Sequence, residues 1–214
     1  MKKNVFVPIL LLWVSAHVAG QVYHYSNPFV SPTENFRIKK ELYTFNEETG
    51  GPSIYRYDMN LLLSTKDYLR SDGERTQTVY NYDANRHLIF STRTYASGAS
   101  ARFEYNYNAD NRLVRRTCIV ADTVAATEYY MYNASGTVTN ARWENFDNWL
   151  TGIIALEIGD NGRILSGTFK GEDGFDAILT FTYDNLGFIS VIRWDFSFGK
   201  FQQFEFEYEP TQSF

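Results

Sequence analysis

The chain has few of the residues from which most catalytic and metal-binding sites are built. It contains one cysteine, Cys118, and three histidines in 214 residues. A single cysteine excludes an internal disulfide. We expect Cys118 to be buried and unreactive, because free cysteine behaves mainly as a small apolar residue. The chain has too few histidines to favour Ser-His-Asp catalysis or a histidine-based zinc site. We therefore predict no catalytic residue, no metal site and no cofactor.

Long apolar runs are also missing, apart from a short one near the N-terminus. Two lysines precede an apolar stretch at 5–14, and Val18 and Gly20 occupy the positions expected three and one before a signal-peptidase cut. The stretch is about half of the roughly 20 residues that a spanning helix needs. We therefore predict a signal peptide at 1–20 and no membrane span. The alternative interpretation of this segment is a transmembrane anchor.

Positive charge is in the minority. The formal net charge is −5, and removing the predicted signal peptide with its two lysines makes the chain more acidic still. An acidic surface repels nucleic-acid phosphates and anionic lipids. We therefore expect no nucleic-acid partner. The sequence instead predicts an exported protein, located in the periplasm, at the cell surface or outside the cell, with a protein or a glycan as its partner.

Aromatic residues are abundant, and they recur at a fixed interval. They make up 17% of the chain, with 16 Tyr and 17 Phe. Pairs of aromatics two residues apart recur about every 25 residues, and we call the second member of each pair the anchor. The anchors are Tyr57, Tyr82, Tyr107, Tyr132, Ile158, Tyr183 and Tyr208. Because side chains two apart share one face of a strand, each pair predicts a half-buried antiparallel strand whose ring-bearing face forms the core.

A turn follows each anchor in fixed phase. Asp or Asn usually stands one residue after the anchor, Gly or Asn four after it, and an aliphatic residue six after it. This pattern is typical of a type I turn that ends in a left-handed residue. Leu61 and Arg86 occupy the fourth position in two copies. We expect those two turns to shift by one residue and to use Asn60 and Asn85.

A second turn falls 15 and 16 residues after each anchor, as Asp-Gly or a related pair such as Asp122-Thr123. The alternation predicts an all-β antiparallel meander of about 13–14 strands, built from two-hairpin repeats of about 25 residues. Because strands twist, we expect a coiled or partly rolled single sheet. The repeat domain covers 53–214. An extended lead-in and first strand precede it at 21–52, with a strand at Phe36–Phe45 and a loop at Glu47–Pro52.

The repeats contain the order Tyr-Asp, two residues, Gly-Arg-Leu, a further turn and another tyrosine pair. This order resembles the YD repeat of the RHS family. Residues 107–113 match it with Asn for Asp and Asn for Gly, and 161–164 and 183–187 match in part. The resemblance covers 53–208. It implies long antiparallel sheets that wrap into a shell, with no catalytic residue to carry over. The unit is longer than is typical of that family, and no toxin-like domain follows Tyr208, so the chain resembles a short exported bacterial version.

Two binding hypotheses follow. The first is a non-catalytic exported scaffold or binding protein that presents its sheet to a protein partner or to a cell-surface assembly. The second is a carbohydrate-binding module that stacks sugar rings on exposed Trp143, Trp149 and Trp194. Two of these tryptophans lie 11 residues after their anchors, in a column that also holds Cys118 and Phe169. The alternative role for that column is packing in the core.

The acidic residues are assigned structural roles. We predict that the Asp or Asn after each anchor caps its turn and does not bind calcium, because calcium loops concentrate several acids in one turn. Glu205, Glu207 and Glu209 alternate on the last strand. We expect them to guard an exposed sheet edge; a glycosidase pair, which needs two carboxylates across a cleft, is the alternative.

Overall fold

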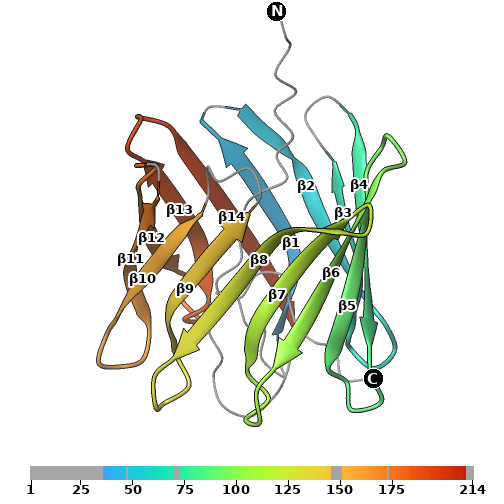
Figure 1. The fold of residues 1–214 in the computed structure, drawn as a ribbon, viewed down its shortest axis with the longest axis horizontal. Helices are drawn as coiled ribbons and strands as arrows, with labels where there is room; N and C mark the ends of the chain where they lie inside the picture. Colours follow the sequence, from blue (N-terminus) through green and yellow to red (C-terminus); the bar gives the residue numbers. More distant parts are fainter. Residues whose placement is uncertain (1–35, 47, 70–72, 146–150, 173, 211–214) are drawn as a thin grey trace, which may run out of the picture.

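The chain forms a closed barrel of antiparallel strands in the computed structural model (Figure 1). The structure describes residues 36–46, 48–69, 73–145, 151–172 and 174–210. Each strand pairs with the next along the chain, and the first pairs with the last. The predicted signal peptide and most of the lead-in lie outside the described residues.

The fourteen strands are β1 (Phe36–Phe45), β2 (Glu48–Tyr57), β3 (Leu63–Leu69), β4 (Arg75–Tyr82), β5 (Leu88–Thr94), β6 (Ser100–Tyr107), β7 (Leu113–Val120), β8 (Thr123–Tyr132), β9 (Val138–Asn145), β10 (Gly152–Ile158), β11 (Ile164–Gly171), β12 (Ala177–Tyr183), β13 (Ile189–Phe196) and β14 (Phe201–Pro210). The predicted all-β meander is confirmed, and so is the first strand. The prediction of a coiled or partly rolled sheet is wrong, because β1 pairs with both β2 and β14 and so closes it.

The ring-bearing face of the repeats points into the barrel, as predicted. Tyr55, Tyr80, Tyr105 and Tyr130, the first members of four aromatic pairs, are each no more than 6% exposed. They belong to one continuous hydrophobic core that also includes Trp194. Burying a large apolar side chain contributes on the order of 1.5–3 kcal/mol. Since every repeat supplies such side chains, the core extends around the whole inner wall.

Where an Asp or Asn follows the anchor, its side chain closes the turn, as predicted; after Ile158 the residue is Gly159, and Asn161 Oδ1 instead accepts from the Arg163 N–H at 3.0 Å. The Oδ1 atom of Asp83 accepts hydrogen bonds from the backbone N–H of Asn85 at 2.9 Å and of His87 at 2.8 Å. The expected shift at the two irregular turns is wrong. Leu61 and Arg86 themselves adopt the left-handed conformation, with φ of 62° and 68°. The surrounding hairpin fixes the turn strongly enough to place a non-glycine residue there.

The second turn usually has the same backbone as the first. Tyr95 N–H donates to the Ala99 carbonyl at 2.9 Å, and Gly98 N–H donates to the Tyr95 carbonyl at 2.9 Å. The turn between β7 and β8 differs. Ala121 and Asp122 both have positive φ, and the strands pair directly on either side of them. This is a two-residue hairpin, so the predicted Asp122-Thr123 turn lies one residue too late.

The loop predicted at Glu47–Pro52 is also wrong, because β2 begins at Glu48. The two glycines in this stretch are required by close packing within a strand. A Cβ atom at Gly50 would lie 2.5 Å from the Tyr68 hydroxyl, and one at Gly51 would lie 2.6 Å from the Leu69 carbonyl. A glycine pair in a strand can therefore mark the approach of a neighbouring chain segment as well as a turn.

Each anchor tyrosine also connects two successive repeats. Its hydroxyl donates a hydrogen bond to the backbone carbonyl 19 residues earlier, for example from Tyr107 to Leu88 at 3.0 Å. Its ring packs against the side chain 20 residues earlier, which is His87 for Tyr107 and Arg112 for Tyr132. The same hydroxyl bond recurs at Tyr57, Tyr82, Tyr132, Tyr183 and Tyr208. The residues at the Gly-Arg-Leu part of the motif thus contact the ring and the hydroxyl of the next anchor.

Candidate functional site

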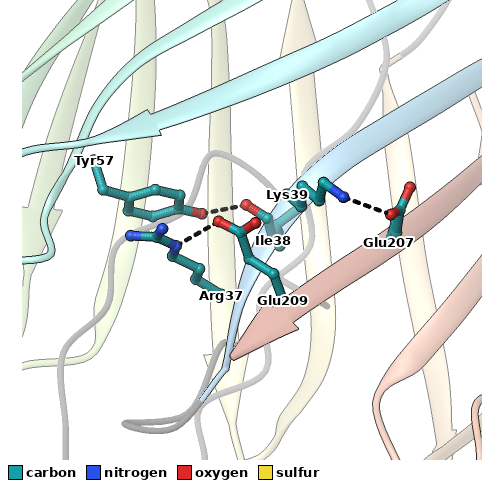
Figure 2. A network of polar contacts seen from close by, with 6 residues as sticks. All are labelled: Arg37, Ile38, Lys39, Tyr57, Glu207 and Glu209. Atoms are coloured by element: carbon teal, nitrogen blue, oxygen red, sulfur yellow. Dashed lines mark hydrogen bonds and ion pairs between the residues drawn. The ribbon is translucent and has the colours of Figure 1, made fainter. Parts of the chain in front are cut away.

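Three groups of side chains could carry a function: the seam that closes the barrel, a set of charged residues inside it, and the tryptophans. At the seam, the Arg37 Nε atom lies 2.7 Å from Glu209 Oε1, and the Lys39 Nζ atom lies 3.1 Å from Glu207 Oε1 (Figure 2). Both acids are therefore paired with β1. The prediction that Glu205, Glu207 and Glu209 guard an exposed edge is wrong, because β14 has a partner on each side.

The first strand, β1, is also joined to β2 by the hydrogen bond and ring contact that join neighbouring repeats. The Tyr57 hydroxyl donates to the Ile38 carbonyl at 2.7 Å, and the Arg37 guanidinium lies 4.9 Å from the centre of the Tyr57 ring (Figure 2). Arg37 and Ile38 stand 20 and 19 residues before this anchor. The strand before the first repeat thus supplies the same stacking cation and carbonyl as a complete repeat does.

Five charged side chains on the inner wall form what we call the inner polar cluster. Its members are Glu41, Lys66, Arg93, Arg116 and Glu128. Four of them are almost completely covered, with side chains between 4% and 15% exposed, and the fifth, Arg93, is half-buried. Charged residues are rarely covered to this extent unless they are paired. The pairing of the cluster therefore decides what it can do.

Glu41 is the centre of one half of the cluster. Lys66 Nζ donates to its Oε1 at 2.7 Å, the Tyr55 hydroxyl donates to its Oε2 at 2.8 Å, and the Ser53 hydroxyl donates to Oε1 at 3.3 Å. Burial lowers the pKa of Lys66, and the Glu41 carboxylate opposes that change. Burial, reinforced by Glu41, raises the pKa of Tyr55. The carboxylate is fully occupied by these donors, so its role is to join β1, β2 and β3.

Glu128 is the centre of the other half. Arg116 pairs with its Oε1, and the Tyr130 hydroxyl donates to its Oε2. Burial raises the pKa of Glu128, and Arg116 opposes that rise. On the next strands, the hydroxyls of Ser91 and Tyr105 lie 3.0 Å apart. Both oxygens of this carboxylate have a partner, and the Arg116–Glu128 ion pair joins β7 to β8.

The inner polar cluster was not predicted from the sequence, although the phase of the repeat contains the signal. Glu128 stands two residues before Tyr130, and Arg116 stands two before Cys118. Residues two apart share a face of the strand, so both are placed inward by the same rule that places the rings inward. Charged residues in strands are usually assigned to solvent, and here the phase was the better guide.

The tryptophans do not have the exposure that the carbohydrate hypothesis requires. Trp143 and Trp194 are 4% and 1% exposed, and their rings stack at 5.5 Å inside the barrel. Phe169 packs between the same strands, 5.7 Å from Trp143. Trp149 lies outside the described residues. The column therefore packs in the core, and Trp143 and Trp194 are not available to stack on sugars at the outer wall.

The remaining candidates occupy structural positions. Cys118 is buried, as predicted, and burial raises the pKa of its thiol. His87 lies in a turn, with its Nδ1 atom 3.1 Å from Asp83 Oδ2. Asp176, in the most acidic loop, pairs with Lys170. Among the described residues, no three His, Cys, Asp or Glu side chains are placed together to hold a metal ion.

No protein-family model matches the chain, and no curated protein is similar to it. Among solved structures, it is similar to a porin-like protein from Bacteroides uniformis, at 10% identity and a TM-score of 0.51, over 80% of this chain and 98% of that one. It also aligns with a chain in the crystal structure of TcdB2-TccC3-Cdc42, at 16% identity and a TM-score of 0.36, over 69% of this chain. The chain spans 8% of the length of that structure.

The likeness to the porin-like protein shows a shared barrel fold and nothing about activity. The structural alignment with the TcdB2-TccC3-Cdc42 chain is too weak to add an argument, so the likeness to YD repeats still depends on the sequence motif. Within the part of the chain that the structure describes, no helix has the length and apolar character needed to cross a membrane.

Proposed function

We propose that the chain is an exported, non-catalytic barrel that serves as a scaffold or binding protein. It presents its outer wall to a protein partner in the periplasm, at the cell surface or outside the cell. The distribution of side chains supports an outer wall that faces water. Rings fill the inner wall, while ion pairs such as Arg142–Glu144 and Arg193–Asp195 lie on the outer one. Barrels that span membranes have the reverse arrangement, with an apolar band outside and a polar interior.

The observation that carries the proposal is a set of three exposed aliphatic side chains on three neighbouring strands. Ile153 on β10, Leu165 on β11 and Ile178 on β12 are 50%, 53% and 59% exposed. They are the most exposed apolar side chains on any described strand. We call this surface the apolar wall. Ile153 lies directly opposite Lys170, which pairs with Asp176, and Ile178 lies opposite Thr168. Leu165 lies near Gly159, at the other end of the β10–β11 pair. A mixture of apolar and polar groups is the usual composition of a non-obligate protein–protein interface.

The test is capture of a partner from the envelope of the exporting cell with the tagged protein. The wild-type protein is expected to retain one specific protein, and Ile153→Glu/Ile178→Glu is expected to lose it. The matched control is Val79→Glu, which adds the same charge to a 40% exposed side chain on β4, on the opposite side of the strand order. Equal capture by the double variant, or equal loss with Val79→Glu, would contradict the proposal.

The non-catalytic part of the proposal has its own test. Purified protein is expected to show no hydrolytic activity toward polysaccharides or peptides. An activity that survives purification and disappears when one acidic residue is changed to its amide would overturn this part. It would leave the assignment of the apolar wall to be decided by the capture experiment.

A further inference from the structure

One member of the inner polar cluster differs from the other four. Arg93 has no ion pair and no hydrogen-bond partner among the described residues, whereas Lys66, Arg116, Glu41 and Glu128 are all paired. Its one specific contact is with an aromatic ring, since the guanidinium lies 5.0 Å from the centre of Phe103. The guanidinium carries five N–H donors and is half-buried, so donors without an acceptor favour the binding of an anion.

The position of Arg93 directs it into the barrel. It lies directly opposite Thr78 on β4 and Ala101 on β6, and both are buried in the inner wall. Lys66, on β3, lies directly opposite Thr78 on the other side of β4. Because directly opposite residues share a face of the sheet, Lys66 and Arg93 point to the same side. Arg93 also lowers the pKa of Lys66 by repulsion between the charges.

A second unsatisfied group lies directly after the end of the same strand. The Tyr95 hydroxyl is buried and has no hydrogen-bond partner in the structure, and the ring packs against the core. Tyr95 opens the turn after β5, two residues after Arg93, and its packing against the core places its side chain inside the barrel. Buried hydroxyls nearly always have a partner. One guanidinium near the end of β5 and one phenol directly after that strand are both unpaired, and both therefore require a hydrogen-bond acceptor.

We propose that the inner wall at β4–β6 binds a small organic carboxylate, with one end on the Arg93 guanidinium and a carboxylate oxygen accepting a hydrogen bond from Tyr95. This site goes beyond the scaffold role proposed above and does not depend on it. A guanidinium matches the planar geometry of a carboxylate. The single unpaired positive charge of Arg93 matches one carboxylate better than a doubly charged anion. The surrounding Phe103, Ala101 and Tyr95 side chains suit an apolar body. Partial exposure of Arg93 gives the ligand a way in.

The test is thermal denaturation of the full mature protein in sodium benzoate, sodium acetate or sodium sulfate, compared with sodium chloride at equal ionic strength. Benzoate is expected to raise the Tm in a saturable way and more strongly than sulfate. Arg93→Gln is expected to weaken benzoate binding about a hundredfold, and Tyr95→Phe about tenfold, as the loss of charged and neutral hydrogen bonds implies. The matched control is Arg102→Gln, which removes an arginine that also stacks on a ring but pairs with Glu104.

Without ligand, Arg93→Gln is expected to change the Tm little, because the arginine loses only its contact with the Phe103 ring and its attraction to the Glu128 carboxylate. If that variant does not fold, Arg93→Lys gives the second measurement, since it keeps the charge and loses the planar fork. Weaker benzoate binding by the lysine variant supports the proposal. A response no greater than that in chloride, an equal response in the Arg93 variants, or an equal response to sulfate would overturn it.

Discussion

Each position of the repeat motif has a distinct structural role. The Asp or Asn after the anchor caps a turn, the fourth residue adopts the left-handed conformation, and the fifth packs on the ring of the next anchor. The aliphatic residue after it packs in the core and offers its carbonyl to the next tyrosine hydroxyl. Neighbouring repeats are therefore joined by side chains of the motif as well as by strand pairing.

Tyr107→Phe tests the hydroxyl tie. The substitution keeps the ring and removes the hydrogen bond to the Leu88 carbonyl, so the free energy of unfolding is expected to fall by about 1 kcal/mol. The matched control is Tyr129→Phe, at an exposed tyrosine on the outer wall, where no loss is expected. Urea unfolding measures both changes. Equal losses at the two positions would show that the tie contributes nothing specific.

Leu61→Gly tests the left-handed position. Because a non-glycine residue at positive φ costs roughly 1–2 kcal/mol, relieving the φ of 62° at Leu61 is expected to raise the free energy of unfolding by about 1 kcal/mol. Gly162 has φ of 77° and nothing within 4 Å of a Cβ atom added to it. Gly162→Ala is therefore expected to cost about the same amount. If neither substitution changed the urea midpoint, the conformational argument would be wrong.

At the scale of elements, the strands and turns could be predicted because periodicity and turn chemistry are local. The period of two assigned Tyr105 and Tyr107 to the inner wall correctly, and Asp83 to its turn. The failures occurred where tertiary contacts decide. Gly50 and Gly51 signalled a loop, but Tyr68 and Leu69 pack against them within a strand. The inner polar cluster was missed because side-chain charge was weighed above strand phase.

The ion pair between β1 and β3 can be tested at this scale. Lys66→Met leaves Glu41 buried without its cation, and breaking a buried pair costs roughly 3–5 kcal/mol. Glu41→Gln/Lys66→Met removes both charges and keeps an acceptor for Tyr55, so it is expected to recover most of the stability.

The matched control for this pair is Lys39→Met, whose partner Glu207 is about half exposed. An exposed pair contributes at most about 1 kcal/mol, so the control is expected to change the urea midpoint little. If Lys66→Met were as mild as Lys39→Met, or the double variant no more stable than the single one, the covered pair would not be joining these strands.

At the scale of the whole molecule, closure could not be predicted from the sequence. A repeat specifies how each unit meets the next, and the curvature accumulated over fourteen strands decides whether the two ends meet. The pairing of β1 with β14 has the register of the anchor hairpins, since Tyr208 lies opposite Ile38 as Tyr82 lies opposite Leu88, but the two strands are far apart in the sequence. Glu207 and Glu209 were therefore assigned to an exposed edge, whereas they pair with Lys39 and Arg37 of the first strand.

The tyrosines give the whole molecule a characteristic response to alkali. Burial raises the pKa of Tyr82, Tyr107 and Tyr208 above the ordinary value. The folded state therefore keeps protons that the unfolded state releases above pH of about 10. The stabilisation is complete below that pH and is lost as the pH rises above it, by about 1.4 kcal/mol per pH unit for each such phenol.

Tyrosinate absorbance and circular dichroism, followed together during an alkaline titration, measure this effect. The buried tyrosines are expected to ionise only as the strand signal disappears, in one cooperative step. Full ionisation at the ordinary pKa with an intact strand signal would show that the rings are accessible to water, which would contradict the inward assignment.

Closure also brings the two ends of the described chain together, since Phe36 lies directly opposite Pro210. A short peptide could join these positions, and the polypeptide could then begin and end at any of the other hairpins without altering a single strand pair. The Arg37–Glu209 contact across the seam joins residues 172 positions apart, whereas every other pairing is between consecutive strands. A rearranged chain of this kind would make the seam a local contact and move the slow, long-range step of folding to a place of the experimenter's choosing.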